Sequence, residues 1–315
     1  MRHVIKKRFL YFVIVVLTLI ILLHPNHNAR RNYEYIHREF IVDSLHVETS
    51  PNFTSSAIVY CDYREVLFDE TALSLSVNDG DLIEGHRIRE GGEYTPVECK
   101  PKFSVALIVP YRENAEQLRS FLVYMHTFLH RQKIHYRIYV VEQVDSRPFN
   151  RAKLMNIGAV TAMRAGYPCL ILHDVDLLPL KPANLYVCTT CPRHMSSSIN
   201  NFRFVLPYLN LIGGAIAIAS KQYKNINGMS NIYFGRTGEN NDLYSRLEAH
   251  NLKLCRFQPQ TSRYHMVMNP AQHRHVIKTS IKNKKSILED GLNSLQYTEV
   301  ASVLHPLFTH IMVDL

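Results

Sequence analysis

The chain lacks the features that mark several non-enzymatic protein classes. Only 12 of its 315 residues are Gly, which excludes a collagen. Charged residues make up 20% of the chain and hydrophobic residues 46%, which excludes a disordered protein. Six Cys in a chain of this length exclude a disulfide-stabilised miniprotein, and no repeat of fixed period is present. A globular protein with one large domain or two ordinary ones remains.

Acidic residues are outnumbered by basic ones. There are 36 Lys and Arg against 27 Asp and Glu, which gives a formal net charge of +9. This balance favours anionic partners such as nucleotides, polyphosphates or membrane surfaces. The sequence shows no aromatic and basic RNA-binding motif, so we expect no nucleic-acid partner.

Residues 9–23 form an apolar run whose only polar groups are the hydroxyls of Tyr11 and Thr18. Basic residues precede the run, and no cleavage site of small residues follows it, which favours an uncleaved anchor over a signal peptide. We expect a cytoplasmic tail at residues 1–8, a transmembrane signal-anchor at residues 9–23, and a single-pass type II topology with a lumenal body.

Residues 24–60 are polar and have no sustained periodicity, which predicts a flexible stem before a single catalytic domain at residues 61–315. The sequon at Asn52 and the six cysteines both fit a lumenal body. Cys188 and Cys191 form a CxxC pair, which leaves half a zinc site as an alternative. No second pair follows at zinc-finger spacing, so disulfides are favoured.

Apolar runs alternate with amphipathic ones in the body. They predict strands at residues 104–110, 136–141 and 169–172 and helices at residues 117–130 and 152–165. This order is typical of a parallel α/β sheet, which binds ligands at the carboxyl ends of its strands.

Polar residues follow two of the predicted strands. Tyr111 and Arg112 follow one, and Asp174 and Asp176 follow another. An Asp-x-Asp motif on an extended backbone can hold a divalent cation that bridges a diphosphate, although an acidic strand end is the alternative.

Three further segments are candidates for ligand binding. Arg151 and Lys153 lie in the first turn of a predicted helix, where a bound anion would offset their unfavourable charge and a solvated basic patch is the alternative. Gly213 and Gly214 allow close approach of a ligand or of another backbone. A Gly-rich loop leads into a helix predicted at residues 242–250, with Asn240 or Asn241 as its cap.

Seven ordered segments resemble the β-1,4-galactosyltransferase family, glycosyltransferase family 7. They are PYREN at 110–114, FNRAKLMNIG at 149–158, DVDLLP at 174–179, RH at 193–194, PYLNLIGG at 207–214, INGMSNIYFGRTGENND at 226–242 and DGLNSL at 290–295. The resemblance runs from about Gly91 to the C-terminus.

The resemblance implies a GT-A fold, which is an α/β nucleotide-sugar-binding domain with a mainly parallel central sheet. It also implies an inverting, Mn²⁺-dependent transfer from UDP-galactose or UDP-N-acetylgalactosamine to the 4-hydroxyl of a terminal N-acetylglucosamine on a glycoprotein or glycolipid. The protein would reside in the Golgi membrane. A modifier subunit or a homodimer is a further partner that the sequence leaves open.

The resemblance carries residue roles over to matching positions. The UDP-sugar contacts would be Pro110, Tyr111, Arg112, Phe149, Arg151, Asp174, Val175, Gly214 and Glu239. The metal ligands would be Asp176 and Met266. The acceptor contacts would be Tyr208, Leu211, Arg236, Asn240 and Asn241. Disulfides would join Cys61 to Cys99 and Cys169 to Cys188, which leaves Cys191 and Cys255 over.

Several positions depart from the family pattern, and three of them bear on catalysis and metal binding. Asn240 stands where the family has its catalytic Asp, Arg236 replaces a Trp, and Asn269 replaces a metal-binding His. An amide cannot take the proton of the acceptor hydroxyl. The chain is therefore either an active transferase whose base is Asp242, Glu239 or the product phosphate, or an impaired homologue that binds UDP-sugar or glycan as a non-enzymatic or partner subunit. We favour the transferase.

Leu211 stands where galactose-preferring members of the family have Tyr. The smaller side chain leaves room beside the C2 substituent of the donor sugar. UDP-N-acetylgalactosamine is therefore a second candidate donor.

Overall fold

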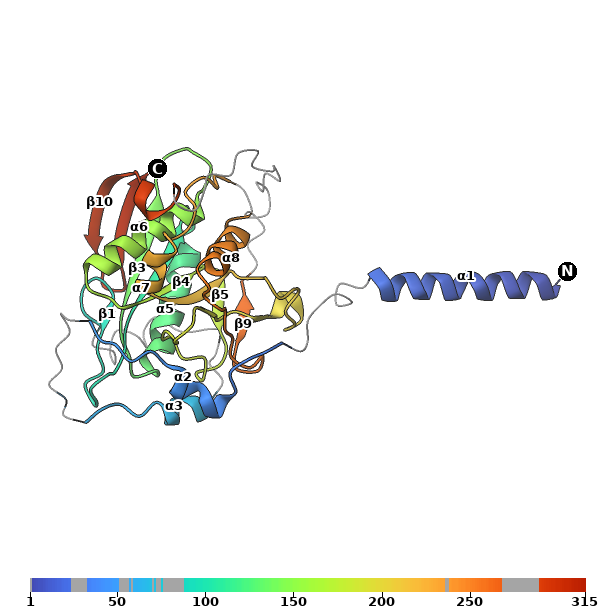
Figure 1. Ribbon diagram of the computed structural model, residues 1–315, viewed down its shortest axis with the longest axis horizontal. Helices are drawn as coiled ribbons and strands as arrows, with labels where there is room; N and C mark the ends of the chain where they lie inside the picture. The colour runs from blue at the N-terminus through green and yellow to red at the C-terminus, as the bar shows by residue number, and fades with distance from the viewer. Residues whose placement is uncertain are drawn as a thin grey trace.

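The computed structural model describes residues 2–23, 33–50, 57, 59–69, 71, 75, 88–235, 238–267 and 289–315 (Figure 1). Its α-helices are α1 (Arg2–Leu23), α2 (Ile41–Ser44), α3 (Arg64–Phe68), α5 (Ala115–His130), α6 (Arg151–Arg164), α7 (Ser220–Asn225) and α8 (Glu239–Ala249). Its strands are β1 (Glu93–Tyr94), β2 (Ser104–Tyr111), β3 (His135–Gln143), β4 (Cys169–His173), β5 (Leu177–Pro179), β6 (Arg193–His194), β7 (Ser198–Ile199), β8 (Ala215–Ala219), β9 (Arg263–Met266), β10 (Thr298–Leu304) and β11 (Thr309–Asp314).

The main sheet is mixed. Its order is β10-β11-β3-β2-β4-β8-β6, with β1 beside β3. The strands β11, β3, β2 and β4 run parallel, whereas β8 runs antiparallel to β4, and β6, β10 and β1 also pair antiparallel. The prediction of a mainly parallel sheet is therefore right only for its centre. Two neighbouring parallel strands are usually joined by a crossover connection that contains an α-helix. The described chain between β4 and β8 contains no α-helix.

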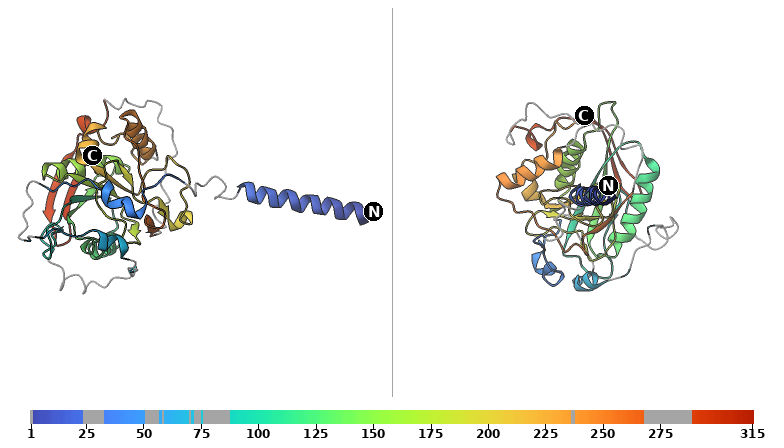
Figure 2. Two further views of the ribbon diagram at one scale, coloured as in Figure 1. Left: turned by 60° about the horizontal axis from the view of Figure 1, so that its bottom comes forward. Right: turned by 90° about the vertical axis from the view of Figure 1, so that its right-hand side faces the viewer.

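Strand β2 is buried on both faces, which explains its uninterrupted apolar sequence. Val105 and Leu107 pack in one core cluster with residues of α5, and Ala106 and Ile108 pack in another with residues of α6. Figure 2 shows helices on both sides of the sheet. The two layers fix β2, β4 and the start of α6, so the carboxyl ends of the strands and the first turn of α6 meet at one edge.

Helix α6 packs closely on the sheet at Gly158. A Cβ atom there would lie 2.4 Å from Cγ2 of Ile108 and 2.9 Å from Cγ2 of Val141. We expect Gly158→Ala to lower the free energy of unfolding by about 1–3 kcal/mol, because these β-branched side chains cannot move aside in a packed core. Denaturant unfolding measures the change. Thr161→Ala on the same helix is the control, with an expected effect of about 0.5 kcal/mol or less. Equal stability of Gly158→Ala and the parent would contradict the expectation.

Helix α1 covers the apolar run at residues 9–23, and Figure 1 shows it apart from the body. Among the described residues, no helix has the length and apolar character needed to cross a membrane. The glycosylation site predicted at Asn52 lies outside the described residues.

Residues 33–50 pack on the body. Ile41 and Leu45 are buried in the core, the backbone nitrogen of Ile36 donates to the carbonyl of Arg256 at 2.8 Å, and Leu45 pairs with Thr189. The prediction of a flexible stem is therefore wrong for these residues. The few apolar side chains that dock are separated by polar ones, so they leave no periodic signal in the sequence.

Candidate functional site

The candidate site begins where β4 ends. The backbone nitrogen of Asp174 donates to the carbonyl of Gly214 at 2.9 Å. Gly214 has φ +74°, and a Cβ atom there would lie 2.4 Å from Leu177 and 2.7 Å from the hydroxyl oxygen of Ser196. Only Gly fits this conformation and this space. The Gly pair thus brings its loop directly against the Asp-x-Asp motif.

Arg151, the first residue of α6, links three segments. Its Nε donates to Oδ1 of Asp174 at 2.5 Å, and its Nη1 donates to Oδ1 of Asn240 at 3.5 Å. Burial alone would lower the pKa of Arg151, but the negative charges of Asp174 and Glu239 outweigh burial and raise it. The start of α6, the end of β4 and the start of α8 therefore form a single site.

Two polar atoms at this site are buried without a hydrogen-bond partner in the part of the chain that the structure describes. They are Nη2 of Arg151 and Oε2 of Glu239. Such groups are costly in a folded protein, because they lose the hydrogen bonds that they made to water. A donor and an acceptor left open at one site fit a ligand that carries hydroxyl groups, as a sugar does.

Asp176 and Met266 come together through a second sheet. Strand β5 pairs with β9 so that Leu177 faces Met266, and the backbone nitrogen of Val267 donates to the carbonyl of Asp176 at 2.7 Å. Burial, aided by the negative charge of Asp174, raises the pKa of Asp176 to about 7. A divalent cation would relieve this unfavourable charge.

The donor set fits a metal that is shared with a diphosphate. Within the described ranges, no group of three or more His, Cys, Asp or Glu side chains could hold a metal ion. The protein offers the carboxylate of Asp176 and the thioether of Met266, so phosphate oxygens would supply further ligands. Asn269, which stands at the expected histidine position, lies outside the described residues.

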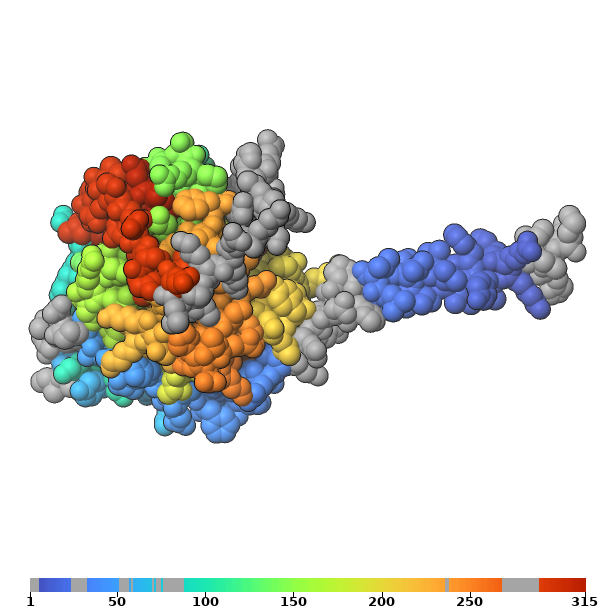
Figure 3. Space-filling model, turned by 45° about the horizontal axis from the view of Figure 1, so that its top comes forward, coloured from blue at the N-terminus to red at the C-terminus, as the bar shows by residue number. Residues whose placement is uncertain are grey.

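Asp242 is not a candidate base, which corrects the sequence prediction. Its carboxylate accepts from Nε of Arg246 at 2.6 Å, and Arg246 also lies 3.7 Å from Asp290. The side chains of this ion pair are 1–3% exposed, and Figure 3 shows the C-terminal residues against the segment that carries α8. Asp242 therefore has a structural role. The sequence did not reveal this role, because Asp290, which also lies near Arg246, is distant in the chain.

Helix α8 starts earlier than predicted. Its first residue is Glu239 and its N-cap is Gly238, with φ +126°. Asn240 and Asn241 are therefore residues of the first turn, so the prediction that one of them caps the helix is wrong. Glu239 gains a place at the positive end of the helix dipole, beside Arg151.

Arg112 holds the loop between β3 and α6. It donates to the carbonyls of Asp145 and Arg147 at 2.8 Å each, and its guanidinium carbon lies 5.8 Å from the centre of the Phe149 ring. The hydroxyl of Tyr111 accepts from a backbone nitrogen at 2.9 Å. These predicted nucleotide contacts share one edge of the sheet. Arg112 uses three donors inside the protein, and these bonds hold this loop in shape.

Two further predicted nucleotide contacts flank the same edge. Pro110 is the penultimate residue of β2, and Val175 lies half-buried between the two aspartates and packs on the core. Their roles as nucleotide contacts stay predictions.

Two of the predicted acceptor residues, Tyr208 and Leu211, lie on one loop, and Asn240 and Asn241 lie in the first turn of α8. Tyr208 is 48% exposed, and its carbonyl accepts from the backbone nitrogen of Leu211 at 3.2 Å. A Cβ atom at Gly213 would lie 2.7 Å from Nδ2 of Asn240, so this loop reaches Asn240. Asn241 is exposed, and Arg236 lies outside the described residues.

All six cysteines form disulfides. The two pairs implied by the family resemblance, Cys61 with Cys99 and Cys169 with Cys188, are confirmed. Cys191 pairs with Cys255 across a sequence separation of 64 residues, so the zinc alternative is wrong. The sequence could not identify this third pair, because separation in the chain does not reveal proximity in the fold.

Two family models match the chain. Residues 64–189 match the family model for the N-terminal region of glycosyl transferase group 7, and residues 193–270 match the model for the N-terminal domain of galactosyltransferase. Mouse β-1,4-galactosyltransferase 3 is 35% identical over 299 residues, which span 90% of this chain and 76% of that protein. Bovine β-1,4-galactosyltransferase 1 is 37% identical over 239 residues, which span 73% of this chain and 58% of that protein.

A solved structure shares the fold. It is a mutant of Drosophila β-1,4-galactosyltransferase 7 in complex with manganese, UDP-Gal and xylobiose. The match has a TM-score of 0.60 and 28% identity, and it covers 68% of this chain and 94% of the other. The family models, the relatives and the shared fold lead to one conclusion: this chain belongs to the β-1,4-galactosyltransferase family, glycosyltransferase group 7.

Proposed function

We propose that the chain transfers galactose from UDP-galactose, with inversion, to the 4-hydroxyl of a terminal N-acetylglucosamine on a glycoprotein or glycolipid. The observation that carries this proposal is the pair of buried, unpartnered atoms on Arg151 and Glu239 beside Asp174. The solved relative with manganese, UDP-Gal and xylobiose supports the donor and the metal.

In an inverting transfer, the acceptor oxygen forms a bond to C1 of galactose while the bond from C1 to the diphosphate oxygen breaks. The acceptor hydroxyl loses its proton to a base. Arg151 would bind and orient the donor sugar through its open Nη2, and Glu239 would keep its open Oε2 for the acceptor hydroxyl. A divalent metal held by Asp176 and Met266 would neutralise charge on the departing diphosphate.

The side chain that accepts the proton of the acceptor hydroxyl has to be identified among Asn240, Asp242 and Glu239. Oδ1 of Asn240 faces Arg151, so its amide NH₂ group is turned to the other side and can only donate. Asp242 is held by Arg246. Glu239 is the carboxylate of the predicted catalytic set that keeps an unpartnered oxygen, and we assign the proton to it.

Leu211 is the proposed determinant of the donor sugar. We expect Leu211→Tyr to shift the ratio of kcat/KM values from UDP-N-acetylgalactosamine toward UDP-galactose by about 10-fold or more, because a larger ring would fill the space beside C2. Leu209→Tyr, on the same loop and 40% exposed, is the matched control. Equal donor ratios for Leu211→Tyr and the parent would remove Leu211 from this role.

The three disulfides support a place for the body in an oxidising compartment, and we propose the Golgi lumen. Sugar donors and glycan acceptors would meet the enzyme there. Because residues 33–50 pack on the body, a shortened soluble form has to keep them.

A UDP-release assay on the full chain tests the proposed function. It uses Mn²⁺, UDP-galactose or UDP-N-acetylgalactosamine, and a β-linked N-acetylglucosamine acceptor. We expect UDP release that depends on both the acceptor and the metal. Binding of UDP-sugar without acceptor-dependent release would instead make the chain a binding or partner subunit.

A further inference from the structure

Arg256 is a buried cation whose side chain bonds to carbonyl oxygens. It is 6% exposed, and its Nη2 donates to the carbonyl of Leu209 at 2.7 Å and to that of Leu211 at 3.0 Å. These two carbonyls belong to the loop that carries Tyr208 and the proposed donor determinant Leu211. A single guanidinium group thus fixes the backbone of the predicted acceptor segment, residues 208–211.

Arg256 makes a further hydrogen bond to a histidine that lies close to the contact of Gly213. Nε of Arg256 donates to Nδ1 of His194 at 3.3 Å. Burial lowers the pKa of His194 to about 3, so its ring is neutral and can accept this bond. Close by, the hydroxyl of Ser196 donates to the carbonyl of Gly213 at 2.8 Å. The loop that contains residues 208–213 is therefore held through Arg256 beside His194 and through Gly213 beside Ser196.

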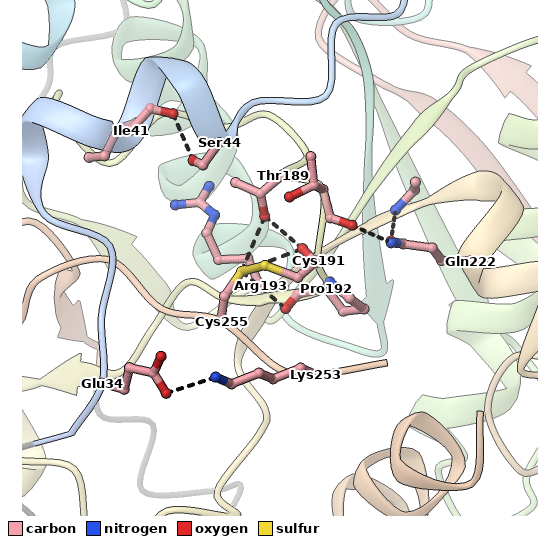
Figure 4. Close-up of a disulfide and its surroundings, with 12 residues drawn as sticks. Glu34, Ile41, Ser44, Thr189, Cys191, Pro192, Arg193, Gln222, Lys253 and Cys255 are labelled. Carbon is pink, nitrogen blue, oxygen red and sulfur yellow. Dashed lines mark hydrogen bonds and ion pairs between the residues drawn. A yellow bond between two sulfur atoms is a disulfide. The ribbon is translucent and has the colours of Figure 1, made fainter. Parts of the chain in front are cut away.

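Arg256 itself is held by a disulfide. Cys255, the preceding residue, is bonded to Cys191, and its backbone nitrogen donates to the carbonyl of Pro192 at 2.9 Å (Figure 4). The hydroxyl of Thr189 lies 3.3 Å from the sulfur of Cys255. This disulfide clamps the chain directly before Arg256.

The N-terminal segment holds Arg256 from the other side. The ring centre of Tyr33 lies 5.4 Å from the guanidinium carbon, and the hydroxyl of Tyr33 lies 2.9 Å from that of Ser197. The backbone nitrogen of Ile36 donates to the carbonyl of Arg256. A segment far from the site in sequence thus covers the arginine that supports it.

We propose that Arg256 is a positioning residue for the segment 208–211, and that the Cys191–Cys255 disulfide and Tyr33 hold Arg256 in place. The proposal rests on the proposed function for the identity of the acceptor. Loss of the two carbonyl bonds would let the segment sample other conformations, and the apparent affinity for acceptor falls with the fraction of molecules in the competent one. UDP binding at Arg151 and Asp176 would be preserved.

The chain has no Trp, which allows a test that does not depend on turnover. Tyr208→Trp in the full chain places one fluorescent reporter on the segment. In this background we would prepare Arg256→Lys, Arg256→Met and the double substitution of Cys191 and Cys255 by Ser. Acrylamide quenching of the reporter is expected to increase in all three, and more for Met than for Lys, because Lys keeps one charged donor.

The same Arg256 and cysteine substitutions, made with Tyr208 intact, give the kinetic readout. We expect the acceptor KM to rise by about tenfold for Arg256→Met, which is the loss of roughly one charged hydrogen bond, while the Kd for UDP in Mn²⁺ stays within about twofold. Arg256→Lys should recover part of the KM. A variant that merely loosened the fold would weaken UDP binding as well.

Matched controls separate positioning from general destabilisation. Arg137→Lys alters a partly buried arginine of β3 that donates to Glu93 at 3.0 Å, away from the acceptor segment. Substitution of Cys61 and Cys99 by Ser removes a disulfide elsewhere.

Unchanged quenching in both Arg256 variants, or an increase in quenching in these controls equal to that in the Arg256 variants, would overturn the proposal. If Arg256→Met does not fold, Arg256→Lys and the double Ser variant decide. If the parent shows no transfer, quenching alone decides, so failure of the proposed function stays distinguishable.

Discussion

Asn240→Asp is expected to raise the rate of acceptor-dependent transfer by ~10²–10⁴-fold, the usual contribution of a positioned general base. The new carboxylate would replace an amide 3.5 Å from Nη1 of Arg151, so the structure already provides a cation that would hold it in place. Gly213 leaves the space into which this side chain extends, so the isosteric change needs no rearrangement. Single-turnover transfer with saturating UDP-galactose measures the chemical step.

Asn241→Asp is the matched control for this experiment. It adds the same charge one residue along the first turn of α8, on an exposed side chain. We expect less than a tenfold change, since an exposed carboxylate away from Arg151 gains no contact with the acceptor hydroxyl. Equal rates for Asn240→Asp and the parent would show that Glu239, the proposed base of the parent, already supplies the full effect of a general base, and Glu239→Gln would then abolish transfer.

Asp176→Asn is expected to weaken Mn²⁺-dependent binding of UDP by at least about 100-fold, because the metal contributes several kcal/mol to the binding of phosphate groups. Asp176 is a half-buried residue whose neighbour Leu177 pairs with Met266, and its neutral analogue keeps the shape of the side chain. Calorimetric titration of UDP with and without Mn²⁺ measures the effect. Asp62→Asn, which changes an exposed aspartate, is the control.

The pH dependence follows from the raised pKa of Asp176. Because the pKa is about 7 in the folded protein and 3.8 ordinarily, a proton competes with the metal below pH 7, and the Mn²⁺ affinity should fall about tenfold per pH unit there.

The same shift in the pKa of Asp176 makes the parent less stable as the pH rises from about 4 to 7, since the folded state binds the proton more tightly than the unfolded state does. Asp176→Asn should remove this decline. A pH-independent Mn²⁺ affinity, or the same stability profile in both proteins, would contradict the assignment.

Local sequence patterns predicted the central elements well. The strand expected at residues 104–110 is β2, and the helix expected at residues 152–165 is α6, each within one residue at either end. These elements are buried along most of their length, so their apolar periodicity is strong. The direction of β8 was not predictable in the same way, because pairing direction depends on the connection and leaves no local pattern.

The site shows the same division. Asp174, Arg151 and Gly214 were identified from motifs, and the structure brings them together because they lie at strand and helix ends that converge on one edge. Asp242 was assigned wrongly, because its position after the Gly-rich loop says nothing of the distant Asp290 that shares Arg246 with it. The contacts of Arg256 with the loop were missed for a related reason. They are made to backbone carbonyl groups, and because every residue has such a group, they leave no pattern in the sequence.

The sequence by itself determined the family, the order of the central strands and helices, and the residue types available for donor and metal binding. Motifs and periodicity carry this information because they depend on residues close in the chain. Only the tertiary structure decided which carboxylates are available, how Cys191 and Cys255 are paired, and that residues 33–50 pack on the body. Each of these depends on contacts between residues far apart in the chain, and such contacts arise only when the chain packs.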